Sequence, residues 1–392
     1  MKPPTHAVPS GDRRMARLLM AALARAGHRV ELASRLRSYD GAGDPARQAA
    51  IAGRASGIAA RLVRRYRARP PAQRPAAWFT YHLYYKAPDW LGPAVADALA
   101  IPYLVAEASH APKRAGGPWA PGHAAAADAI ARAAAIFTLN PADAECLAPL
   151  AGAGRVVRLP PFLDAALPSP ERSRSGFAQA GGQAPPPRAA ARAVLAGRFG
   201  LDPRRTWLLA VAMMRVGDKL ASYRLLGQAL RRLRDLDWQL LAVGDGPARD
   251  AVEAALAGLD VRYAGAQAGQ DLAAFYAAAD LCVWPAVNEA YGMALLEAQA
   301  AGLPVVAGAA GGVAAIVADG ATGLLTPVGD EAAFAAALRR LILDPARRAA
   351  MGAAARAKAA REHDIATAAA ILDAELRRAC AAAKHRTCRP SP

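Results

Sequence analysis

The chain has 392 residues, a formal net charge of +17 and 54% hydrophobic residues, and its length suits two domains of ordinary size. It contains no run of roughly 18 strongly apolar residues and no apolar signal-peptide stretch at its start, so we expect neither a membrane span nor a leader. The four cysteines lack metal-type spacing, which fits a reducing cytoplasm. The positive charge favours an anionic partner such as a nucleotide or anionic lipid, but no nucleic-acid-binding motif accompanies it, so we expect no nucleic acid.

The first predicted element is a helix over residues 12–27 that ends at a glycine. After it, short apolar runs alternate with alanine-rich helical stretches, which is the pattern of parallel sheets covered by helices. The strands predicted in the first half are RVELAS (29–34), AWFTYH (77–82), PYLVAEAS (102–109), AIFTL (135–139) and RVVRL (155–159). A doubly wound domain normally opens with a strand, and residues 1–10 are too rich in proline to supply a central one. We therefore expect the first strand of this domain to be missing.

The second half repeats the alternation after a stretch, 167–188, that is rich in proline, glycine and serine and indicates a mobile loop or linker. Its predicted strands are WLLAVAM (207–213), WQLLAVG (238–244), VRYAG (261–265), LCVWP (281–285), LPVVAG (303–308) and GLLTP (323–327). The predicted fold is α/β, with two Rossmann-like, doubly wound parallel-sheet domains that face each other across a cleft. The predicted divisions are an N-terminal domain over 1–164, a linker over 165–203, a C-terminal domain over 204–360 and a helix with a tail over 361–392. Ligands of such sheets bind beyond the carboxyl ends of the strands.

Two cations, Arg215 and Lys219, follow the strand predicted at 207–213. A guanidinium fork and a flexible ammonium at the end of a strand suit a diphosphate. In an arginine-rich chain two solvated cations explain the same residues, and taken alone the pair favours that interpretation.

Two glycine-rich turns also follow predicted strands. GDGP (244–247) permits a tight turn into a helix, and such a turn is more often structural than phosphate-binding. AAGG (309–312) is a second turn at which backbone could approach a ligand.

The stretch NEAYGMALLEAQAAG (288–302) carries Glu289 at the start of an apolar helix and Glu297 inside it. A helix that is apolar nearly all round is buried, and a buried carboxylate needs a partner. Eight residues of helix rise roughly 12 Å, too far for the two carboxylates to share a proton. They would therefore contact different parts of an elongated ligand, while the free amides at the helix start, near Tyr291 and Gly292, favour a phosphate. A nucleoside-diphosphate sugar meets all of these groups, and a backbone cap or an arginine partner for Glu297 is the structural alternative.

These motifs resemble the retaining glycosyltransferases of family 4, also called group 1, which have the GT-B fold. The resemblance rests on the E-x7-E pattern of EAYGMALLEAQAAGLPVVA, on VGDGP and on YAGAQAGQDLAAFYAAADLCVWP, and it continues through ADGATGLLTP. It covers nearly all of residues 200–355. The likeness is looser in the first half, where GHRVEL, a strand ending at His110, and RLPPFLD carry it.

The resemblance implies a retaining glycosyltransferase of the hexosyltransferase type that uses a UDP- or GDP-sugar, needs no cofactor or metal and transfers to a hydroxyl acceptor. It implies that the last helix crosses back to brace the first domain. Catalytic roles fall on Glu289, which would contact the donor sugar hydroxyls, on Arg215 and Lys219, which would hold the diphosphate, and on His110 from the first half. The remaining implied donor-binding residues are Glu297 at the ribose, backbone at Gly292 and Met293, then Tyr291, Gly11 and Gly265.

The chain departs from the family pattern in several places. It has Glu289-Ala290-Tyr291-Gly292 where the family usually has Glu-Gly-Phe-Gly, and its Arg215-to-Lys219 spacing is one residue shorter than is common. An acidic residue that often follows the glycine pair is absent, and alanines occupy 314–315.

Other polar residues have weaker functional interpretations. Asp235 and Asp237 mimic a metal-binding DxD, although a solvated helix end explains them better. His82 precedes the aromatic stretch LYYKAPDW, which could line an acceptor pocket or simply pack a loop, and His28 fits a turn from helix to strand. His110 follows an apolar strand and is the stronger candidate.

Three functions stay open at this point, with the glycosyltransferase favoured. A dehydrogenase on two Rossmann-like domains would need a strand-linked GxGxxG that the chain lacks. A non-catalytic anion- or membrane-binding scaffold is the third. The basic helical stretch RLVRRYRAR (61–69) could contact anionic membrane from the cytoplasmic side, and a solvated helix face explains the same charges. The acceptor stays unassigned, with glycans, lipid-linked sugars and small molecules all open.

Overall fold

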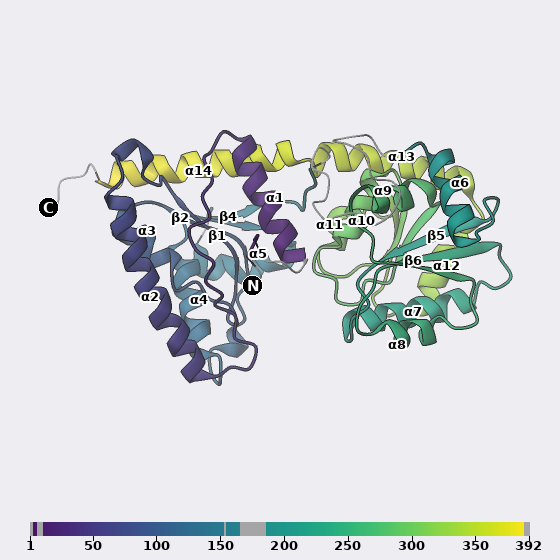
Figure 1. Cartoon of the computed structure of the whole chain (residues 1–392), viewed down its shortest axis with the longest axis horizontal. Helices are drawn as coiled ribbons and strands as arrows, with labels where there is room; N and C mark the ends of the chain where they lie inside the picture. The colour runs from purple at the N-terminus through teal and green to yellow at the C-terminus, as the bar shows by residue number, and fades with distance from the viewer. Residues whose placement is uncertain (1–2, 6–10, 153, 165–185, 388–392) are drawn as a thin grey trace. The chain divides into compact units, whose positions relative to one another are not determined.

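The computed structural model describes residues 3–5, 11–152, 154–164 and 186–387. The chain divides into two compact units (Figure 1). Unit 1 comprises Met1–Pro160 together with Ile365–Pro392, and unit 2 comprises Pro161–Asp364. Among the described residues, no helix combines the length and the apolar character that a membrane crossing requires.

Unit 2 is built on a six-stranded parallel sheet in the order β10-β9-β8-β5-β6-β7. Its strands are nearly continuous apolar runs, and Leu208, Leu240 and Val283 are completely buried. Such runs are typical of parallel strands that are covered on both faces. The strands are β5 (Thr206–Val211), β6 (Trp238–Val243), β7 (Val261–Gly265), β8 (Leu281–Trp284), β9 (Val305–Gly308) and β10 (Gly323–Thr326).

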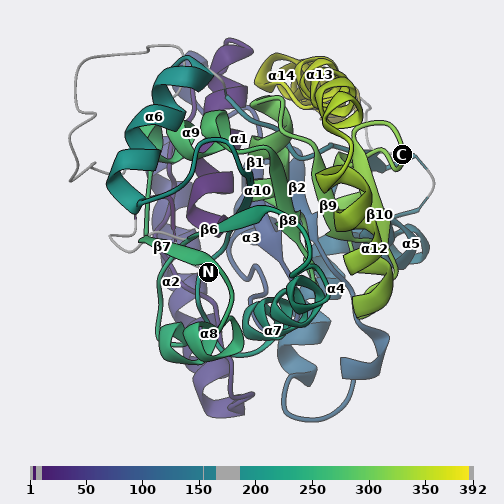
Figure 2. The same cartoon turned by 90° about the vertical axis from the view of Figure 1, so that its right-hand side faces the viewer.

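Helices cover both faces of this sheet, with α7 and α8 on one face and α9 and α10 on the other (Figures 1 and 2). The helices are α6 (Arg188–Phe199), α7 (Asp218–Arg231), α8 (Arg249–Ala255), α9 (Gly269–Ala278), α10 (Met293–Ala300), α11 (Val313–Ile316), α12 (Glu331–Ile342) and α13 (Pro345–Glu362). Helix α6 occupies residues that the sequence assigned to the linker, and it contributes Ala191 and Leu195 to the core of unit 2. The first part of the expected linker, residues 165–185, lies outside the described residues.

Unit 1 contains a four-stranded parallel sheet in the order β1-β2-β3-β4. Its strands are β1 (Trp78–Leu83), β2 (Tyr103–Ala108), β3 (Ala135–Thr138) and β4 (Val156–Arg158). Its helices are α1 (Gly11–Arg25), α2 (Pro45–Arg67), α3 (Gly92–Leu99), α4 (Ala120–Arg132), α5 (Pro141–Ala151) and α14 (Ile365–Thr387). The first and last of these helices lie side by side (Figure 1), and His28 beside α1 meets Asp373 of α14 at 2.8 Å.

The structure confirms the α/β class and every predicted strand except RVELAS at 29–34. That segment has no regular secondary structure, its residues are partly or fully exposed, and it pairs with no strand in the described part of the chain. Its Glu31 instead accepts hydrogen bonds from Arg65 and Arg69 at the end of α2. The prediction was wrong because alternating apolar residues do not show whether a segment pairs with a neighbouring strand. Residues 29–34 are held instead by the ion pairs of Glu31 with α2.

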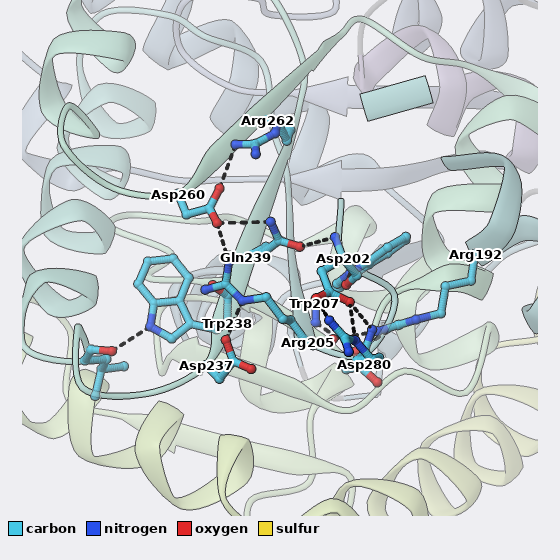
Figure 3. A network of polar contacts seen from close by, with 12 residues as sticks. Arg192, Asp202, Arg205, Trp207, Asp237, Trp238, Gln239, Asp260, Arg262 and Asp280 are labelled. Carbon is cyan, nitrogen blue, oxygen red and sulfur yellow. Dashed lines mark hydrogen bonds and ion pairs between the residues drawn. The ribbon is translucent and has the colours of Figure 1, made fainter. Parts of the chain in front are cut away.

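A network of charged residues ties together the amino ends of the strands in unit 2 (Figure 3). Asp237, Asp260 and Asp280 immediately precede β6, β7 and β8, and Arg205 immediately precedes β5. Arg205 pairs with both Asp237 and Asp260. The network therefore links adjacent strands at the edge of the sheet opposite the loops discussed below.

Asp280 is the most enclosed carboxylate of this network. Its side chain is only 13% exposed, and it accepts a hydrogen bond of 2.8 Å from the Trp207 amide. It also pairs at 3.0 Å with Arg192, whose guanidinium lies 4.2 Å from the centre of the Trp207 ring. Its removal would leave a buried amide and an enclosed cation without this acceptor.

We predict that Asp280→Ala lowers the free energy of unfolding by about 3 kcal/mol, because buried partners lose their counter-charge. The matched control is Asp235→Ala, which breaks an exposed pair with Arg339 and should cost clearly less than Asp280→Ala. Urea unfolding of both variants measures the difference. Equal losses in the two variants would contradict a structural role for the enclosed network.

Candidate functional site

The sequence-predicted residues of unit 2 gather at the carboxyl edge of its sheet. The loops that follow β5, β6, β8 and β9 all leave this edge, because the strands are parallel. The residues concerned are 212–217, 244–248, 285–292 and 309–312.

Glu289 lies at the centre of these loops with its charge compensated. Its carboxylate forms an ion pair with Lys219, the second residue of α7, and accepts a hydrogen bond of 3.2 Å from the Trp284 indole. The Lys219 ammonium also lies 5.3 Å from the centre of the Trp284 ring. The side chains of Glu289 and Lys219 are only 17% and 22% exposed, so each group needs the other where it lies.

The backbone that carries Glu289 is strained and pinned. Ala286 and Asn288 both have left-handed backbone, with φ of 53° and 54°. The Val287 amide donates to Ser222 at 3.0 Å, and the Asn288 side chain donates to Asp218 at 2.9 Å, both on α7. Left-handed conformations of non-glycine residues are unfavourable and persist only where surrounding contacts enforce them.

The AAGG turn holds the same loop from the other side. A Cβ on Gly311 would overlap the Glu289 carbonyl oxygen, and one on Gly312 would lie 2.7 Å from the Ala290 carbonyl oxygen. The Gly312 amide donates to that Ala290 carbonyl at 2.9 Å. The two glycines therefore permit a close approach to the backbone of the loop that carries Glu289.

The GDGP turn has the same structural role beside the loop that carries Arg215. A Cβ on Gly244 or Gly246 would overlap a carbonyl oxygen of that loop, at Ala212 or Met214 respectively. The Gly244 amide donates at 2.9 Å to the carbonyl of Gly265, which ends β7. These contacts favour the structural interpretation of the turn.

Arg215 and Lys219 differ in their surroundings. Arg215 is exposed and forms no ion pair with any residue that the structure describes, whereas Lys219 is paired with Glu289. Their predicted role at a diphosphate stays a prediction, and so does that of Gly265.

Helix α10 begins directly beside this loop. Gly292 caps it in a left-handed conformation with φ of 75°, and Tyr291 and Met293 on either side are half-buried. The first amides of a helix have no intrahelical partner, and α10 has no side-chain cap. Its amino end can therefore supply N–H donors to an anion.

Glu297 lies on the same helix in a separate environment. It is half-buried, and its carboxylate accepts a hydrogen bond of 2.9 Å from the hydroxyl of Tyr276, a buried residue of α9. Glu297 therefore has the hydroxyl of Tyr276 as a partner. Glu289, in the loop before α10, and Glu297, within α10, therefore have different partners.

Sequence reasoning missed Trp284 and Tyr276 as site residues. Both lie within the stretch that carried the family resemblance, but as apolar-looking members of a strand and a helix. The position of Trp284 could have indicated a site residue, because it is the last residue of β8 and ligands of such sheets bind at the carboxyl ends of the strands.

The DxD pair is not part of this site. Asp235 pairs with Arg339, and Asp237 with Arg205 at the opposite edge of the sheet. Among the residues described, no group of three or more His, Cys, Asp or Glu side chains is arranged to hold a metal ion.

The predicted residues of unit 1 are His110 and Gly11. His110 lies two residues beyond β2, and the centre of its ring is 4.7 Å from that of His123. Partial burial lowers the pKa of His110, and the charge of His123 lowers it further. Gly11 is the exposed first residue of α1. Their proposed roles towards the donor stay predictions.

A titratable cluster in unit 1 was also missed. His82 and Glu107 lie opposite each other on β1 and β2, with left-handed φ of 63° and 59°, and their side chains meet at 3.1 Å. Burial and then the charge of Glu107 raise the pKa of Asp143, in the first turn of α5, to about 6. Nothing in the periodicity of these segments indicates that three strand ends bring them together.

We predict that Asp143→Asn stabilises the protein at pH 7, by on the order of 1 kcal/mol once solvent screening is considered. The folded-state pKa is raised from an ordinary 3.8 to about 6, so between these values the native state binds a proton that the unfolded chain does not. The free energy of unfolding of the wild type therefore falls as the pH rises through this window, and the gain in the variant should vanish near pH 4.

Chemical denaturation at several pH values measures this difference. The control is Asp128→Asn, a change at an exposed carboxylate paired with Arg132. A gain for Asp143→Asn that does not change with pH would contradict the assigned titration.

Comparison with known proteins relates the segment that carries this site to one family model. Residues 205–344 match the family model described as glycosyl transferases group 1. The two parallel-sheet units have the GT-B fold, and the matched segment is similar to the group 1 glycosyltransferases.

A D-inositol 3-phosphate glycosyltransferase of Salinispora tropica is 38% identical over 173 residues, which cover 41% of this chain and 36% of that protein. The chain spans between about a fifth and a little over a third of the length of the curated relatives it matches first.

Solved structures extend the likeness of fold to most of the chain. A sucrose-phosphate synthase from Thermosynechococcus elongatus has a TM-score of 0.68 at 21% identity and covers 97% of each chain. Anabaena HepE, solved in complex with UDP and glucose, has a TM-score of 0.61 at 19% identity and covers 83% of this chain and 82% of its own.

Proposed function

We propose that this protein is a glycosyltransferase that moves a sugar from a nucleoside-diphosphate sugar to a hydroxyl group of an acceptor. The observation that carries the proposal is the placement of Glu289 shortly before α10 and of Glu297 within α10, each with its own partner, in a segment that matches the group 1 glycosyltransferase model. A carboxylate accepts hydrogen bonds from neighbouring hydroxyls, which both the ribose and the donor sugar offer.

The ribose would bind at Glu297. Tyr276 already holds one oxygen of this carboxylate through its hydroxyl, which fixes the orientation of the side chain. A charged acceptor in a partly enclosed position forms hydrogen bonds of about 1.5–3 kcal/mol each. This contact would supply a large share of the affinity for the nucleotide.

The diphosphate would lie at the amino end of α10, with Arg215 and Lys219 as its cations. Arg215 is exposed and unpaired among the described residues, so a ligand phosphate would give it a counter-charge. Lys219 now compensates Glu289 and would be shared between that carboxylate and the phosphates. Cations and helix amides stabilise a leaving diphosphate without a metal, and we propose metal-independent transfer on that ground.

The donor sugar would contact Glu289 and the backbone near Gly292 and Met293. Transfer would retain the anomeric configuration, with a diphosphate oxygen assisting the acceptor on the same face of the sugar. The donor nucleotide would be UDP or GDP, and we favour UDP because Anabaena HepE, which has a similar fold, was solved in complex with it. We place the reaction in the cytoplasm, with a peripheral contact to anionic membrane at the inner face.

We predict that UDP or GDP at 100 times its dissociation constant raises the stability of the wild type by about 2.7 kcal/mol. Glu297→Ala should weaken binding about tenfold or more, because it removes the hydrogen bonds to the ribose. Thermal melting with UDP, GDP and NAD measures both effects. Each variant is compared with itself without ligand, since Tyr276 also loses its partner in Glu297→Ala.

The matched control is Glu253→Ala, which removes an exposed carboxylate of α8 paired with Arg249 and should leave the ligand-induced shift unchanged. A shift with NAD alone would contradict the proposal and favour a dehydrogenase. A UDP shift of the same size in Glu297→Ala would contradict the assignment of the ribose site.

A further inference from the structure

Trp284, the last residue of β8, gives the Glu289 carboxylate a neutral hydrogen-bond donor beside its ion pair with Lys219. Both donors reach the same carboxylate oxygen, Oε2. Among the residues that the structure describes, none donates a hydrogen bond to the other oxygen, Oε1. Glu289 therefore has one oxygen that the protein holds and a second oxygen that can accept hydrogen bonds from a ligand.

The two donors differ in their freedom to move. Lys219 carries its ammonium on a long flexible stem. The Trp284 indole is rigid and only 4% exposed, and its ring meets the buried ring of Tyr223 edge to face with the centres 5.1 Å apart. Tyr223 is itself held by a hydrogen bond of 3.0 Å from its hydroxyl to the Ala212 carbonyl. The surroundings therefore fix the indole, whereas the ammonium can turn towards a ligand.

Binding of the donor would change what Lys219 supplies to Glu289. In the proposed complex the ammonium is shared with two phosphates, so it compensates the carboxylate less completely than in the free protein. The side chain of Glu289 is only 17% exposed, and water therefore replaces a weakened donor poorly. The indole N–H is a donor only and carries no charge that a phosphate attracts, so its hydrogen bond to Oε2 can persist.

We infer that Trp284 is a positioning residue for sugar recognition. Its N–H holds Oε2 of Glu289 while Lys219 turns to the diphosphate, so that Oε1 meets the hydroxyls of the donor sugar. A polar group discriminates between ligands when fixed neighbours hold its orientation. This role rests on the proposed glycosyl transfer, and it separates the residue that orients the sugar-binding carboxylate from the cation that binds the phosphates.

The test compares nucleotides with and without a sugar. The probes are UDP and GDP, then UDP-glucose, UDP-galactose, UDP-N-acetylglucosamine and GDP-mannose, and calorimetry below the melting temperature of every variant gives their dissociation constants. For the nucleotide sugar that the wild type binds best, the ratio of its constant to that of the free nucleotide isolates the contribution of the sugar. Trp284→Phe removes the N–H and keeps an aromatic ring beside Tyr223.

The matched control is Trp238→Phe. Trp238 is also 4% exposed, and its indole N–H donates at 2.7 Å to the Leu233 carbonyl near the amino end of β6. This variant therefore loses a buried indole hydrogen bond in the same sheet, away from the candidate site.

We expect Trp284→Phe to weaken binding of the nucleotide sugar about tenfold and binding of the free nucleotide less than about twofold. Trp238→Phe should leave the ratio of the two constants unchanged, even where it lowers the melting temperature. Lys219→Gln should weaken both ligands by the same factor, because the indole still holds Glu289 while the phosphates lose a cation.

A double-mutant cycle distinguishes positioning from a purely structural role. If Trp284 acts through Glu289, Trp284→Phe should cause no further loss of sugar binding in the Glu289→Ala protein, so the two losses are not additive. Additive losses would overturn the inference, and so would an equal weakening of nucleotide and nucleotide sugar by Trp284→Phe. A change of the ratio in Trp238→Phe as large as that in Trp284→Phe would also overturn it.

Failure of the proposed function gives a different result. A wild type that binds no nucleotide, or whose sugar contribution survives Glu289→Ala, contradicts the proposed donor site and the role of Trp284 with it. A wild type whose sugar contribution is lost in Glu289→Ala and kept in Trp284→Phe contradicts only the role of Trp284.

Discussion

The ion pair between Glu289 and Lys219 connects the loop after β8 to helix α7, 70 residues away in the chain, and the arrangement of the candidate donor site depends on it. Each charge is mostly enclosed and would be costly alone, so the pair fixes the position of both. The indole of Trp284 and the glycine turn at 311–312 hold the same loop from two further directions. The start of α10, and with it the distance from Glu289 to Glu297, follows from this arrangement.

The two edges of the sheet in unit 2 have different physical characters. At the amino edge, Asp280 and its neighbours are satisfied by arginines and backbone amides, which stabilises the fold and leaves little capacity for a ligand. At the carboxyl edge, two non-glycine residues have left-handed backbone and Arg215 is exposed. Strain and uncompensated charge are unfavourable in the free protein and become useful when a ligand binds.

Much of the fold could be predicted from the sequence, because buried parallel strands are continuous apolar runs and such runs are visible without a structure. The segment 29–34 could not be judged in this way, since its apolar residues look like a strand and its ion pairs are tertiary. In the site, the motif identified both glutamates, but the Lys219 and Tyr276 partners and the role of Gly311 depend on contacts between segments far apart in the sequence. The contact of His82 with Glu107, and the effect of Glu107 on Asp143, were not predicted for the same reason.

The most direct test of the account is hydrogen exchange of the backbone amides with and without UDP, resolved along the chain. The account predicts slower exchange at 285–296 and 212–220 on addition of UDP, because the nucleotide would contact both loops at the carboxyl edge. Exchange at the amino ends of β5 and β6 should not change. Protection confined to the amino edge, or spread evenly over unit 2, would contradict the proposed donor site.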